Sequence, residues 1–198
     1  MSTIQATNIK SAASASNNIV LDASGNAAFA GTAAMASSFL RNRIINGAQS
    51  IDQRNNGASA SIGSVAIAYI TDRNGVFNAG PNAITAQRVA GPTGFQNALQ
   101  ITGSASNAGV SWFQRIEANN TFDLASVSVT FSAVVSSSAN RTITAAVTTP
   151  NSFENFSSQT AGPTTAWSIT TTPTRFSFTF TMPANAVNGA EMQLHLGA

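Results

Sequence analysis

The sequence has no cysteine, one histidine and very few charged side chains. Without cysteine, disulfides and thiolate metal sites are excluded. Charged residues make up 8% of the chain, against roughly 25% in an average soluble domain. The net charge is only +2, and the arginines beyond position 73 are scattered, so the basic stripe of a nucleic-acid-binding protein is missing. We therefore expect no nucleic acid among its partners.

Long apolar runs are missing as well. No stretch approaches the roughly 18 apolar residues that a membrane span needs. The first residues, MSTIQATNIKSAAS, lack the apolar region of a signal peptide. We therefore expect no membrane insertion, and a protein that is made and kept in a cytoplasm unless it leaves by another route, such as within a virion.

Patterns that carry catalysis or hold cofactors are also missing. The sequence has no GxSxG, HExxH, Walker or GxGxxG pattern, and its seven acidic residues are dispersed. A glycosidase needs two carboxylates that face each other across a cleft, whereas Asp52 and Asp72 each have a nearby arginine that favours the ionised form. His195 lies in an alternating segment and is expected to be a plain strand residue. We expect no enzyme activity, no cofactor and no metal site.

What the chain does contain is a series of short alternating segments. In FSFTFTM, residues 176–182, phenylalanine and methionine face one way while serine and threonine face the other. Turn sequences rich in glycine, proline and asparagine separate such segments. The pattern predicts an all-β protein, a jelly-roll β-sandwich. The predicted strands span residues 43–45, 64–71, 83–89, 98–102, 110–117, 127–135, 142–148, 167–170, 176–182 and 191–196.

The first 38 residues differ from the rest, because they hold too few large apolar side chains to enclose a core. Within them, NIVLDASGNAAFAGT at 18–32 predicts a β-hairpin. An isolated hairpin is marginally stable, so it must dock on a neighbour or repeat by symmetry, as in a trimer; an unstructured tail is the alternative. We predict an extended N-terminal anchoring and oligomerisation arm, 1–38, and a sandwich domain, 39–198. The candidate assembly residues are Ile19, Val20, Leu21 and Phe29.

The few charges gather in two motifs, RNRIINGAQSIDQRNNG at 41–57 and YITDRNG at 69–75. In so charge-poor a chain, clustered charges are usually paired structural groups. We predict structural ion pairs from Asp52, Arg54, Asp72 and Arg73, with the two arginines tying the motif loops together. A lock between subunits is the alternative, because arginine suits bidentate pairing with carboxylates.

These motifs belong to a longer series, which continues with GFQNALQIT (94–102), VSWFQRIE (110–117), VTFSAVV (129–135) and TRFSFTFTMP (174–183). The series resembles a jelly-roll module of bacteriophage tail fibres and related virion proteins, which is similar to galactose-binding-like and carbohydrate-binding jelly rolls. The resemblance covers about residues 40–198. The segment NIVLDASGNAAF also resembles the N-terminal parts of phage fibres that hold the fibre to the tail or baseplate.

The resemblance implies a virion structural protein, a trimeric tail fibre attached to the tail or baseplate that contributes to host attachment. The implied partners are further copies of the chain, other virion proteins and a host surface glycan. A capsid decoration (cement) protein and a free carbohydrate-binding module are the alternatives. Deleting the arm would separate them, because only a free module would keep its whole function without it.

Jelly rolls often stack sugars on exposed tryptophan or tyrosine rings, which makes three residues of this chain candidates. Trp112 shares a face with Val110 and Ile116, so we expect it in the core. Tyr69 lies in an apolar segment and is expected in the core or at its rim. Trp167 follows the turn sequence AGPTT and is the candidate glycan contact.

Overall fold

The computed structural model describes residues 8–9, 13, 19–21, 23–24, 27–29, 42–107 and 109–197. The chain divides into two units, Met1–Arg41 and Asn42–Ala198. The division falls three residues after the boundary that the sequence predicts.

The described part of the first unit is a small antiparallel sheet. It holds β1 (Asn8–Ile9), β2 (Ile19–Leu21) and β3 (Ala27–Phe29) in that order. The predicted hairpin is confirmed as the β2–β3 pair. Among the candidate assembly residues, Ile19 is half-buried and Val20 is exposed, while the side chains of the other two, at positions 21 and 29, lie outside the described residues.

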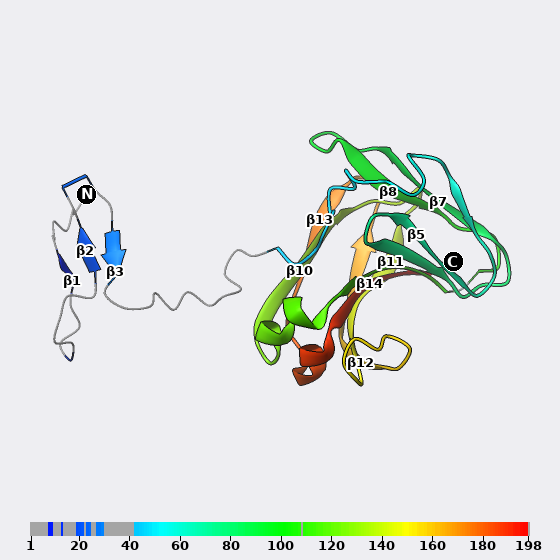
Figure 1. The fold of residues 1–198 in the computed structure, drawn as a ribbon. Coiled ribbons are helices and arrows are strands. Elements are labelled where there is room, and N and C mark those ends of the chain that lie inside the picture. Colours follow the sequence, from blue (N-terminus) through cyan, green and yellow to red (C-terminus); the bar gives the residue numbers. More distant parts are fainter. Residues whose placement is uncertain are drawn as a thin grey trace. The chain divides into compact units, whose positions relative to one another are not determined.

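The second unit is built on a six-stranded antiparallel sheet (Figure 1). Its strand order is β12-β11-β14-β9-β6-β5, so segments far apart in the sequence lie side by side. The strands are β5 (Ala66–Thr71), β6 (Asn74–Asn78), β9 (Val110–Ile116), β11 (Arg141–Pro150), β12 (Gln159–Ile169) and β14 (Ala190–Gly197).

The opposite layer of the second unit consists of two separate sheets. One contains β4 (Ala60–Ile62), β7 (Ile84–Ala90) and β8 (Asn97–Thr102), and the other contains β10 (Ser128–Val135) and β13 (Thr174–Thr181). Each packs on one end of the six-stranded sheet through its own hydrophobic cluster. The all-β class and the sandwich are confirmed, and the jelly-roll order stays a prediction.

The core follows the alternation that the sequence predicts. In β13 and the residue that follows it, Phe180 and Met182 are buried while Thr179 and Thr181 are exposed. On β9, the even-numbered residues from Val110 to Ile116 face the core. The odd-numbered residues of β9 therefore project from the opposite face of the six-stranded sheet, which we call the outer face.

The predicted strand at residues 43–45 is wrong. These residues pair with side chains rather than with a neighbouring strand. The Ile45 N–H donates to Gln114 Oε1 (2.7 Å), and Gln114 Nε2 donates to the Ile45 carbonyl (2.8 Å). The Arg43 guanidinium forms an ion pair with Asp123 (2.6 Å). The segment is thus held by specific polar contacts without regular secondary structure.

Three short 3-10 helices complete the second unit. They are η1 (Ala118–Asn120), η2 (Phe122–Leu124) and η3 (Ala184–Asn188), and Figure 1 shows them together at one end of the sandwich. Among the described residues, no helix has the length and apolar character to cross a membrane.

Candidate functional site

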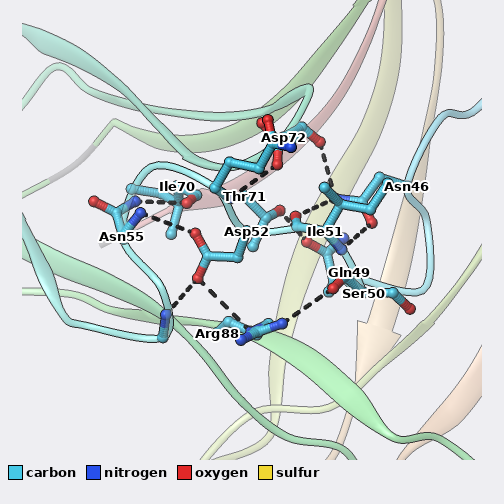
Figure 2. A network of polar contacts seen from close by, with 12 residues as sticks. Asn46, Gln49, Ser50, Ile51, Asp52, Asn55, Ile70, Thr71, Asp72 and Arg88 are labelled. Carbon is cyan, nitrogen blue, oxygen red and sulfur yellow. Dashed lines mark hydrogen bonds and ion pairs between the residues drawn. The ribbon is translucent and has the colours of Figure 1, made fainter.

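The first charged motif forms a loop that folds around the Asp52 carboxylate (Figure 2). This side chain is fully buried. Its oxygens accept backbone N–H groups from Asn55 (3.1 Å) and Gly57 (2.6 Å), and Arg88 Nε lies 3.7 Å away. Arg88 also donates to the Ser50 carbonyl (3.1 Å). The carboxylate therefore fixes the shape of the loop, because an unpaired buried charge would be costly.

The two motifs are joined by polar contacts that do not involve arginine. Asn46 Nδ2 donates to the carbonyls of Ile51 (2.8 Å) and Asp72 (3.0 Å). The Gln53 N–H donates to Asp72 Oδ2 (3.0 Å). The Ile51 carbonyl also accepts from the Asp72 N–H (3.1 Å), so the second motif lies directly against the first.

The structure gives the four predicted ion-pair residues different partners from those expected. Asp52 pairs with Arg88, which lies outside both motifs. Arg73 pairs with Glu117. No ion pair within the described part of the chain includes Arg54 or Asp72. Arg54 does contact the second motif, because its guanidinium lies 5.8 Å from the centre of the Tyr69 ring.

The motifs converge on a pocket of about 330 Å³ beside the outer face of the six-stranded sheet, which we call the outer-face pocket. The sequence has nine Lys and Arg and seven Asp and Glu residues, and six of these charged residues line this pocket. Two aromatic rings complete the lining. The lining residues are Arg54, Tyr69, Asp72, Arg73, Arg115, Glu117, Glu154 and Phe156.

A ladder of two arginines and three aromatic rings runs along the pocket. From Arg54 and Tyr69 it continues to Phe113, whose ring meets Tyr69 edge-on at 5.7 Å between centroids. The Arg115 guanidinium lies 5.2 Å from Phe113 and 5.0 Å from Phe156. Cations over aromatic faces are attracted by the ring quadrupole. The ladder therefore fixes the positions of two guanidinium groups before any ligand arrives.

The Phe113 ring requires a glycine on the neighbouring strand. Gly75 lies opposite Phe113 in the β6–β9 pairing. A Cβ atom at Gly75 would lie only 2.3 Å from Phe113 Cζ. The ring therefore lies flat across β6, which explains why Phe113 is buried although it is on the outer face.

Ion pairs hold three of the charged side chains that line the pocket, those of Arg73, Arg115 and Glu117. Arg115 Nε donates to Glu191 Oε2 (2.7 Å), and Arg73 donates to Glu117. Burial raises the pKa of Glu117, but hydrogen bonds and the Arg73 charge outweigh burial, so this pKa lies below its usual value. Glu117 is thus held as a carboxylate.

The β11–β12 turn supplies a wall that the sequence did not predict. Glu154 Oε1 accepts the Ala118 N–H (3.1 Å), and the Glu154 N–H donates to the Asn188 carbonyl (2.9 Å). These two bonds hold the turn against η1 and η3, and they place Phe156 over Arg115. The sequence TTPNS at 148–152 predicts a turn here, but no motif or periodicity marks Glu154 or Phe156 as residues of a site.

The prediction that Trp167 contacts a glycan is wrong. Its side chain is only 4% exposed, and its ring is stacked between Phe131 (5.8 Å) and Phe176 (5.5 Å) in the core. A sugar cannot stack on a ring whose faces are already covered. Trp112 packs against the core as expected, with its Nε1 donating to Asn74 Oδ1 (3.1 Å). Tyr69 is half-buried and lines the pocket.

His195 lies on β14, away from the residues that line the pocket. Its Nδ1 is 2.9 Å from Ser111 Oγ. Desolvation lowers its pKa, and Glu191 partly offsets that effect. The described residues contain no group of three or more His, Cys, Asp or Glu side chains placed to hold a metal ion.

Comparison with known proteins assigns no family. No family model matches the chain, and no curated protein matches it. Two solved structures are similar over much of the chain. A CBM4 carbohydrate-binding module is 15% identical, with a TM-score of 0.34 over 78% of this chain and 89% of that one. The enzymatically active domain of bacteriophage CBA120 tailspike protein 4 is 14% identical, with a TM-score of 0.39 over 77% of this chain.

The chain spans about a fifth of the tailspike chain. At these identities and TM-scores, neither similarity carries a functional assignment. The outer-face pocket and the sequence motifs that line it are therefore the features that indicate a function.

Proposed function

We propose that this chain is a structural protein of a bacteriophage virion, a trimeric tail fibre that is attached to the tail or baseplate and helps to bind the host. In this proposal the N-terminal arm anchors and oligomerises the protein. The sandwich then displays the outer-face pocket, which binds a glycan of the host surface. The resemblance of the motifs to phage fibre modules supports the virion role, and the pocket supports the binding role.

The observation that carries the binding role is the convergence of three separate motifs on one pocket. Arg54 comes from the first motif, Tyr69 and Arg73 come from the second, and Arg115 and Glu117 come from VSWFQRIE. Charges are rare in this chain, so their concentration at one place is not a property of its surface in general. A pocket of this size falls in the range of about 300–1,000 Å³ typical of small-molecule sites.

The chemistry of the lining suits a saccharide. Sugar hydroxyls both donate and accept hydrogen bonds, and the pocket offers guanidinium donors next to carboxylate acceptors. The rings of Tyr69 and Phe156 provide apolar surface for the C–H faces of a sugar. Because the ladder and the ion pairs hold these groups in place, little ordering free energy is needed on binding.

A free carbohydrate-binding module is the second candidate, and the same pocket supports it. A capsid decoration protein would use the arm on neighbouring capsomers. The three proposals differ in what the arm does, and therefore in what its removal changes.

Removing residues 2–38 should abolish incorporation into phage particles and trimer formation, while the sandwich stays folded. The second unit has its own hydrophobic clusters, and its first residues are held by Gln114 and Asp123. Particle content is measured by immunoblotting, and oligomeric state by light scattering. Full incorporation of the shortened chain would contradict the anchoring role. Imaging of labelled particles separates tail from capsid attachment.

Replacing Arg54 with methionine should weaken glycan binding roughly tenfold or more. A hydrogen bond to a charged group contributes about 1.5–3 kcal/mol, and 1.4 kcal/mol is about a factor of ten in affinity. Arg54 is exposed and its described partner is the Tyr69 ring, so the fold should tolerate the change. Affinity is measured on a glycan array and then by calorimetry with the saccharides that bind.

The matched control for this variant is Arg175→Met. Arg175 is an exposed arginine on β13, in the layer opposite the six-stranded sheet, and it donates to Ser132 Oγ (3.1 Å). This control should leave glycan affinity unchanged. If the two variants bind glycans equally, the outer-face pocket is not the binding site.

A further inference from the structure

We infer that the outer-face pocket selects an uncharged saccharide and disfavours an acidic one. This inference rests on the proposed glycan-binding function and adds the class of ligand. A pocket with three arginines would ordinarily be expected to bind carboxylates. The partners of the charged side chains in this pocket reverse that expectation.

Two of the three pocket arginines already have carboxylate partners within the protein. Arg73 pairs with Glu117, and Arg115 pairs with Glu191, whose side chain is only 5% exposed. A ligand carboxylate would have to compete with these protein carboxylates for the same guanidinium groups. The charge of both arginines is therefore compensated before a ligand binds, although their remaining N–H groups can still donate.

Two other pocket carboxylates each have one oxygen that accepts a backbone N–H and a second oxygen with no hydrogen bond or ion pair among the described residues. Asp72 Oδ2 accepts the Gln53 N–H (3.0 Å), and Glu154 Oε1 accepts the Ala118 N–H (3.1 Å). The second oxygen of each carboxylate, Asp72 Oδ1 and Glu154 Oε2, can accept a ligand hydroxyl. For an acidic sugar the same two groups are repulsive, and such repulsion is a common source of specificity.

Arg54 does not reverse this balance. It is the pocket arginine whose described partner is an aromatic ring rather than a carboxylate. Against its single positive charge stand Asp72 and Glu154, so the charges that remain uncompensated sum to a negative value. Arg54 therefore serves as a hydrogen-bond donor at the rim rather than as an anion site.

The test compares saccharides that differ in one carboxylate. The probes are matched pairs of glucose with glucuronate, galactose with galacturonate and mannose with mannuronate, each presented as the monosaccharide and as a short oligosaccharide. Binding to the full-length protein is measured by calorimetry at 50 and 500 mM NaCl. We expect the tightest binder to be neutral, its acidic counterpart to bind at least roughly tenfold more weakly, and neutral binding to change less than about twofold with salt.

The variants Asp72→Asn and Glu154→Gln sharpen the test. Each removes one repulsive charge. The single amide oxygen can keep the bond to the Gln53 or Ala118 N–H, while the amide NH2 faces the ligand as a donor. The difference in affinity between the neutral sugar and its uronate should therefore narrow. If a uronate binds best, with an affinity that falls steeply with salt, the inference is overturned while the glycan-binding function stands. If no saccharide of either class binds, the proposed glycan-binding function fails as well.

Discussion

Replacing Trp167 with alanine should lower the free energy of unfolding by about 4 kcal/mol, since truncation of a buried tryptophan or phenylalanine typically costs 3–5 kcal/mol. The ring is 4% exposed and stacks on Phe131 and Phe176, which join β10, β12 and β13. Chemical denaturation followed by circular dichroism measures the change. Retained stability would contradict the placement of this ring in the core.

A conservative variant separates packing from binding. Trp167 Nε1 is buried and has no hydrogen-bond partner among the described residues, so Trp167→Phe removes volume without breaking a described polar contact. It should destabilise the protein much less than alanine does. Because this ring lies in the core rather than at the surface, glycan affinity should be unchanged in Trp167→Phe. A loss of affinity in a fully folded Trp167→Phe protein would restore the glycan contact that the sequence suggested.

Replacing Arg115 with methionine should destabilise the protein by about 1–3 kcal/mol. Removing one partner of a fully buried ion pair costs about 3–5 kcal/mol, and the cost is smaller here because the Arg115 side chain is 33% exposed. The change leaves the Glu191 carboxylate, whose side chain is 5% exposed, without its cation. It also removes the cation between Phe113 and Phe156. The free energy of unfolding in urea measures the effect.

The double variant Arg115→Met/Glu191→Gln tests the cause. Glutamine carries no charge and can still accept from Gln193 Nε2, the second donor to this side chain. Most of the stability lost in the single variant should therefore return, which is the signature of coupling between contacting residues. If the single and double variants are equally unstable, the lost stability comes from the contacts of Arg115 with the aromatic rings and not from the unpaired Glu191 carboxylate.

Strands in which apolar and polar residues alternate could be predicted from the sequence. A strand that contains glycine and buried asparagine could not. The residues of β10 and β13 alternate strictly, and their positions follow the prediction closely. β6 reads NGVFN, a sequence typical of a turn, yet it lies inside the six-stranded sheet. Asn78 is fully buried there because its Nδ2 donates to the carbonyls of Gly63 (2.9 Å) and Asn82 (2.8 Å). When the hydrogen-bond partners of a buried polar side chain come from other segments, no local pattern in the sequence reveals them.

The start of β12 could not be predicted from the local sequence either, and for this reason the prediction for Trp167 is wrong. The sequence AGPTT reads as a turn, so the strand was expected to begin at 167, whereas β12 begins at Gln159. It forms one edge of the six-stranded sheet, and Pro163 falls at the register shift between Ala161 and Thr164 in the pairing with β11. Edge strands and bulges are the places where a sheet tolerates proline. The residue after the supposed turn is therefore in mid-strand, with its side chain toward the core.

The sequence pointed to some of the residues that line the pocket, but not to how they come together. The motifs that hold Arg54, Asp72 and Arg73 stood out because charge is rare in this chain. Their partners did not, because Glu117 and Glu154 approach only through the pairing of β6 with β9 and through the β11–β12 turn. Long-range pairing of this kind is a property of the folded sheet rather than of any local segment.

The most direct test of this account is to map the bound sugar on the protein. The full-length chain, labelled with ¹⁵N, is titrated with the neutral saccharide that binds most tightly, and backbone amide shifts are followed by NMR. We predict that the largest shifts cluster at residues 53–55, 69–73, 115–118 and 153–157, around the outer-face pocket. Shifts centred instead on β10 and β13, in the opposite layer, would show that the outer-face pocket is not the saccharide-binding site.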